Sequence, residues 1–201
     1  FTALTLTKTK EVKNILIFDC DVHQGDGTAR ILETNDRIFT CSIHSSKNFP
    51  YRKANSDLDI GLEDNMSWFG YKRHLVEGLN KCIERFSPDL VLYVAGVDIH
   101  ANDKLGRLSI DDEGLFEREM IVLNFFKKRD IPIATVMGGG YSDDNNELAY
   151  RHANVVKELL GSEKCMKEGF EQINESGNSA LMHAAISGHV DVVKELLGSE
   201  K

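Results

Sequence analysis

The chain has 201 residues, 41% of them hydrophobic, and a formal net charge of −8 at pH 7. This composition supports a buried core, and the acidic balance without a basic stripe argues against a nucleic-acid partner. Four scattered cysteines without a CxxC pair indicate reduced thiols. We therefore expect a cytoplasmic protein with no membrane span and no signal peptide.

Apolar stretches alternate with amphipathic ones along most of the chain. The predicted strands are residues 14–23, 37–43, 90–95 and 131–137, and the predicted helices are residues 28–32, 68–86, 110–128 and 145–160. Residues 1–10 resemble the tail of a helix or a linker, and residues 44–66 a long polar loop. Strands that alternate with helices predict an α/β fold, in which helices flank a parallel sheet.

The stretch from Phe18 to Thr28 reads FDCDVHQGDGT and follows an apolar run. Because side chains alternate along a strand, Asp19, Asp21 and His23 should point the same way. Two carboxylates and an imidazole at the end of a buried strand are costly to desolvate unless a cation lies among them. The alternative is a polar strand end that faces solvent, and we favour the metal site.

Two further predicted strands end in motifs of the same kind. One ends in AGVD, which contributes Asp98, and the other in GGGY, which contributes Tyr141. The carboxyl ends of parallel strands meet at one edge of a sheet, so Asp98 could join Asp21 and His23. One imidazole and two carboxylates with an open position suit a catalytic Zn2+, although Fe2+ or another divalent ion would fit too. Tyr141 could donate its hydroxyl to an oxygen on that metal.

Three motifs in this order, DCDVHQGDGT, VAGVDIHANDKLGRLSI and GGGY, resemble the carboxy-terminal half of the histone deacetylase superfamily. The AGVDxxxxDxLGxLS form is similar to class IV and bacterial deacetylase-like members. The resemblance implies an arginase-like α/β fold and hydrolysis of acetylated lysine peptides or small acylated amines. We assign residues 1–153 to this deacetylase-like domain and expect its amino-terminal half to lie upstream of Phe1.

The resemblance also implies roles for individual residues. Asp21, His23 and Asp98 match the zinc ligands, and Tyr141 matches the tyrosine that polarises the acyl carbonyl and stabilises the oxyanion. The remaining matches are the carboxylates that orient the paired catalytic histidines (Asp19 and Asp26), a K+ site (Asp19 and Ser42 with carbonyls near His23 and Ile43) and a substrate tunnel (Phe49, Leu105, Gly139 and Gly140).

The family's paired catalytic histidines have no counterpart, because the sequence contains no His-His dipeptide. A general base of this kind contributes roughly 10²–10⁴-fold to the rate. One hypothesis is a zinc-dependent hydrolase fragment with impaired activity, and another is an inactive remnant that binds metal and protein partners. An arginase-like hydrolase of another amide ranks last, because it would need more aspartates for two metals.

The end of the chain has a different pattern. Residues 177–197, GNSALMHAAISGHVDVVKELL, resemble an ankyrin repeat, and VVKELLGSEK occurs at residues 155–164 and again at 192–201. We predict an ankyrin-like helical segment over residues 154–201, with an accidental amphipathic helix pair as the alternative. So short a repeat stack buries too little core alone. We expect it to pack on the catalytic domain, with continuation of the repeats in a longer protein as the alternative, and to offer a surface to a protein partner.

Overall fold

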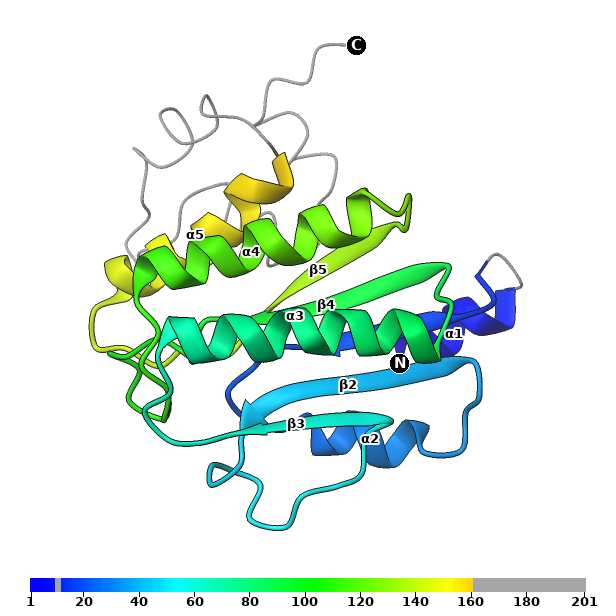
Figure 1. Cartoon of the computed structure of the whole chain (residues 1–201), viewed down its shortest axis with the longest axis horizontal. Coiled ribbons are helices and arrows are strands. Elements are labelled where there is room, and N and C mark those ends of the chain that lie inside the picture. The colour runs from blue at the N-terminus through cyan, green and yellow to red at the C-terminus, as the bar shows by residue number, and fades with distance from the viewer. Residues whose placement is uncertain (10–11, 161–201) are drawn as a thin grey trace. The chain divides into compact units, whose positions relative to one another are not determined.

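The computed structural model of the protein describes residues 1–9 and 12–160 (Figure 1). The chain divides into two units, Phe1–Ser142 and Asp143–Lys201. In the second unit the structure describes one helix, α5 (Asn145–Leu160). The ankyrin-like helices predicted within residues 177–197 and their packing lie outside the described residues.

The first unit is built on a five-stranded parallel sheet in the order β3-β2-β1-β4-β5. Its strands are β1 (Ile15–Asp19), β2 (Ile38–Ser45), β3 (Leu58–Leu62), β4 (Leu90–Gly96) and β5 (Ile133–Gly138). The central strand β1 pairs with both β2 and β4. Because both faces of a parallel sheet are covered, β1 is apolar on both sides, and Ile15, Leu16 and Phe18 are fully buried.

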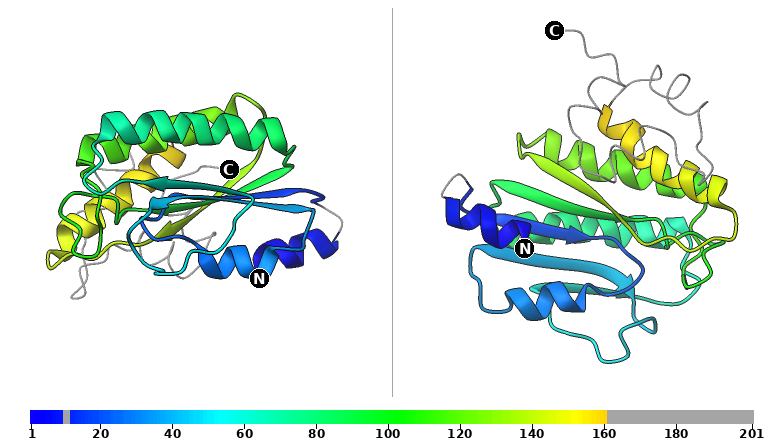
Figure 2. Two further views of the ribbon diagram at one scale, coloured as in Figure 1. Left: turned by 60° about the horizontal axis from the view of Figure 1, so that its bottom comes forward. Right: turned by 180° about the vertical axis from the view of Figure 1, so that it is seen from behind.

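Helices cover both faces of this sheet. Two of them, α1 (Thr2–Thr9) and α2 (Asp26–Leu32), lie on one face, and α3 (Trp68–Arg85) and α4 (Asp112–Lys127) lie on the other (Figure 2). Leu75, Leu79 and Cys82 on α3 are buried at helical spacing. The layered arrangement confirms the predicted α/β fold. Within the described part of the chain, none of the helices combines the length and hydrophobicity needed to cross a bilayer.

Two predicted boundaries were wrong. The strand predicted over residues 14–23 ends at Asp19, because the carboxylates of Asp19 and Asp21 accept the backbone N–H groups two residues ahead, at 3.0 and 2.8 Å, and turn the chain. The loop predicted over residues 44–66 contains the strand β3, and β2 continues to Ser45. The segment LDIGL of β3 pairs in parallel with β2. The aspartate and the glycine in this segment obscured its strand pattern in the sequence.

The contribution of the core under α3 can be measured by truncating one buried side chain. Leu79 is fully buried, so Leu79→Ala should lower the free energy of unfolding by about 2–5 kcal/mol. The matched control is Val76→Ala on the same helix, since Val76 is 39% exposed and should tolerate the change. Urea unfolding of both variants tests this; equal losses would contradict the packing of α3 described here.

Candidate metal centre

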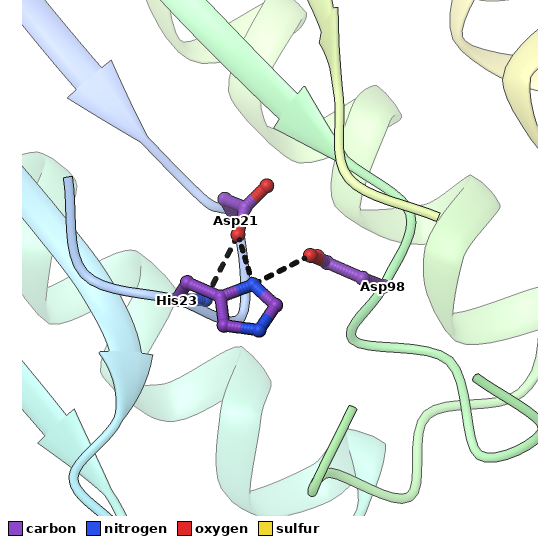
Figure 3. A group of neighbouring side chains, drawn as sticks. All are labelled: Asp21, His23 and Asp98. Atoms are coloured by element: carbon purple, nitrogen blue, oxygen red, sulfur yellow. Dashed lines mark hydrogen bonds and ion pairs between the residues drawn. The ribbon is translucent and has the colours of Figure 1, made fainter. Parts of the chain in front are cut away.

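The carboxyl ends of β1 and β4 carry the residues that converge in space. The two strands pair in parallel up to Asp19 opposite Val94, so the segments that follow them leave the same edge of the sheet. Asp21 and His23 come from the first segment and Asp98 from the second (Figure 3). Their ligand atoms all lie within 4.8 Å of one another. Among the described residues, the structure therefore brings together the three residues predicted from the sequence to be metal ligands.

Hydrogen bonds fix the orientation of these side chains. His23 Nδ1 lies 2.9 Å from Asp21 Oδ1 and 3.1 Å from Asp98 Oδ2 (Figure 3). The backbone N–H of Val22 donates to Asp98 Oδ1 at 2.9 Å, and that of His23 donates to Asp21 Oδ1 at 2.8 Å. Each carboxylate thus accepts a hydrogen bond from the backbone of the turn that follows β1, and each faces the imidazole.

The electrostatics of the cluster favour a positive charge at its centre. Burial raises the pKa of Asp98 to about 6, and the hydrogen bond to Asp21 raises the pKa of His23 to about 10. Burial is the largest single influence on Asp21 and acts to raise its pKa, but the hydrogen bonds with His23 and Asp98 together outweigh burial and leave this pKa below its usual value. The imidazole therefore keeps a proton between two carboxylates. One nitrogen and several oxygens around that position form a donor set that fits a divalent ion.

Two glycines pack directly against the carboxylates. A Cβ atom on Gly139 would lie 2.0 Å from Asp98 Oδ2 and 2.6 Å from Asp21 Oδ2. A Cβ atom on Gly96 would lie 2.6 Å from Asp21 Cα and 2.9 Å from Asp98 Oδ1. Only glycine lets the backbone come this close, so the end of β5 forms one wall of the cluster. Gly140 follows with φ 136°, a conformation that also favours glycine.

Tyr141 borders the cluster. Its ring is perpendicular to that of His23, with 6.4 Å between the centroids, and the residue is 46% exposed. Its backbone N–H donates to Asp103 Oδ2 at 2.6 Å, and its carbonyl accepts from the Lys104 N–H at 3.0 Å. Sequence reasoning missed Asp103, whose only signal was its place in the motif with Asp98.

The other predicted site residues include two pairs, one on adjacent loops and one on adjacent strands. Phe49 and Leu105 are exposed by 68% and 52%, and the side-chain amide of Asn48 donates to the Leu105 carbonyl at 2.8 Å, so their loops lie side by side. Asp19 and Ser42 lie opposite each other on β1 and β2. Burial raises the pKa of Asp19 to about 7.

Asp26 is the outlier. It begins α2 and pairs with Arg30 at 3.5 Å, outside the three-residue cluster. Its predicted partners are the paired catalytic histidines, which have no counterpart in this sequence, so its role in orienting them stays a prediction.

The chain resembles known proteins along most of its length. The family model for the histone deacetylase domain matches residues 1–159, and the model for ankyrin repeats (3 copies) matches residues 148–201. An uncharacterized protein of Picosynechococcus sp. is 43% identical over 149 residues, which cover 74% of this chain and 50% of that protein. Histone deacetylase 2 of Arabidopsis thaliana is 31% identical over 133 residues, covering 65% of this chain and 34% of that protein.

Solved structures share the fold. A histone deacetylase homologue from Aquifex aeolicus superimposes with a TM-score of 0.68 at 22% identity, covering 98% of this chain and 49% of that one. The HDA15 HD domain superimposes with a TM-score of 0.65 at 22% identity, covering 81% of this chain and 50% of that one. The chain thus spans half or less of the length of these relatives. Since the deacetylase model covers most of its residues, the chain belongs to the histone deacetylase family, with ankyrin repeats towards its carboxy-terminal end.

Proposed function

We propose that this chain carries the metal-binding part of a zinc-dependent deacetylase, with Asp21, His23 and Asp98 as the ligands. The observation that carries the proposal is the convergence of their three ligand atoms, which all lie within 4.8 Å of one another. A mixed nitrogen and oxygen set without thiolate suits Zn2+, and Fe2+ is the second candidate. When bound, the ion would act as a Lewis acid towards the acyl carbonyl.

The residues around the cluster would bind and orient the substrate, an acetylated lysine peptide or a small acylated amine. The Tyr141 hydroxyl, at the border of the cluster, would donate a hydrogen bond to the oxyanion that develops from the carbonyl oxygen. The exposed apolar side chains of Phe49 and Leu105 would line the path of the acylated chain. A K+ ion beside Asp19 and Ser42 would offset the cost of ionising the buried Asp19 carboxylate.

A general base is the missing component of this site. The family's histidine pair has no match in the sequence, so we expect the 201-residue chain alone to have impaired activity. The alternative function is an inactive metal-binding remnant in a protein-interaction module, which the ankyrin match favours. Turnover after addition of a histidine-bearing upstream half would separate a hydrolase fragment from such a remnant.

The metal assignment predicts the zinc content of purified variants. His23→Ala should lose most of the bound zinc, because one buried and one half-buried carboxylate without the imidazole make a poor and uncompensated site. His74→Ala is the control, since His74 lies on α3 and outside the cluster. Elemental analysis measures both; equal zinc in His23→Ala and the parent would refute the ligand set.

The catalytic assignment predicts how turnover depends on Tyr141. The chain alone should hydrolyse acetyl-lysine substrates very slowly, and turnover should appear when a half that carries the histidine pair is supplied. In that complex Tyr141→Phe should lower kcat by roughly 10²–10³, because it removes one donor to the oxyanion. Tyr150→Phe, on the exposed side of α5, should leave kcat unchanged. Full activity of the short chain would mean that another residue supplies the base.

A further inference from the structure

A buried ion pair lies behind the metal cluster, on α4. Arg118 and Glu119 have side-chain exposures of 0% and 1%. Arg118 Nε donates to Glu119 Oε1 at 2.9 Å, and Nη2 donates to the same carboxylate oxygen. The pair is therefore shielded from solvent, and Arg118 is the largest fully buried side chain among the described residues.

The remaining arm of the guanidinium reaches the two segments that carry the metal ligands. Arg118 Nη1 donates to the carbonyl of Gly96 at 2.6 Å and makes a longer contact, 3.4 Å, with the carbonyl of Cys20. Cys20 immediately precedes Asp21, and Gly96 lies two residues before Asp98. The Cys20 N–H makes the last bond between the two strands, to the Val94 carbonyl at 3.0 Å. One side chain thus ties the strand ends together at the point where their ladder stops.

Stability alone is a weak reason for such a pair. Desolvating two charges often costs as much as their attraction returns, so apolar residues of similar volume are often as stable or more stable. The buried oxygens that lack a hydrogen-bond partner include the hydroxyls of Tyr71 and Tyr93 and Glu119 Oε2. Arg118 interacts electrostatically with both tyrosines and with Glu119. Burying these polar groups therefore costs folding free energy. What Arg118 offers in return is a rigid fork of donors that can hold its acceptors in a fixed geometry.

We propose that Arg118, held by Glu119, is a positioning residue for the metal centre. By fixing the Cys20 and Gly96 carbonyls, it sets the separation between the turn that carries Asp21 and His23 and the turn that carries Asp98. The ligands are thereby arranged before an ion binds. This inference rests on the proposed metal-binding function and adds the residue that holds the site's two halves in register.

Cobalt(II) binding by the 201-residue chain tests the proposal without any turnover. The double variant Arg118→Met/Glu119→Leu removes the tether without leaving an unpaired charge, so it should unfold in urea near the parent's midpoint. It should bind Co2+ about 10–100-fold more weakly, the usual effect of losing a residue that supports metal ligands, with altered visible absorption bands. Arg118→Lys keeps the positive charge but loses the planar fork of donors, so its Co2+ affinity should fall between those of the parent and the double variant. Arg73→Met, an exposed arginine on α3, should match the parent.

Each outcome decides a different claim. If the parent chain itself binds no Co2+, the proposed metal-binding function fails, whatever the variants do. If the parent binds and the folded double variant has the same affinity and the same spectrum, Arg118 stabilises the core only and the positioning role is wrong. If the double variant does not fold, Arg118→Lys decides: weakened binding by a folded protein supports the role, and parent-like affinity overturns it.

Discussion

The parallel pairing of β1 with β4 is the constraint on which the site depends. Their register, with Asp19 opposite Val94, delivers two turns to one edge of the sheet. Asp21 and His23 on one turn then meet Asp98 on the other, although 75 residues separate His23 from Asp98 in the sequence. Desolvated carboxylates gathered in this way need a positive charge among them, which the protonated imidazole supplies here and which a divalent ion would supply in the proposed enzyme.

The cluster is supported from two sides by groups that have no metal chemistry of their own. Gly139 and Gly96 allow the backbone to come against the carboxylates of Asp98 and Asp21, where any side chain would collide. On α4, Arg118 bonds the carbonyl of Gly96 and contacts that of Cys20. The ligands are therefore held by packing as well as by hydrogen bonds, which is what a preorganised site requires.

The sequence carried enough information for the fold class and for the three converging residues, because these depend on the order of apolar strands and on polar motifs at their ends. It did not reveal that β1 ends at Asp19, since the turn depends on carboxylates that accept neighbouring N–H groups. Nor did it reveal β3, because the pairing of β3 with β2 depends on contacts between residues that are distant in the sequence. In the sequence, Arg118 is one polar residue among others of an amphipathic helix. Only its burial and its hydrogen bond to Gly96 in the structure point to its proposed positioning role.

The most direct test of the metal centre is X-ray absorption at the zinc edge on the purified chain. Ligation by Asp21, His23 and Asp98 predicts only nitrogen and oxygen neighbours, at roughly 2.0–2.2 Å, with the signature of a single imidazole that disappears in His23→Ala. The described thiols Cys20, Cys41 and Cys82 are buried and free, and none belongs to the cluster. A sulfur neighbour at about 2.3 Å, or a spectrum unchanged in His23→Ala, would contradict the account.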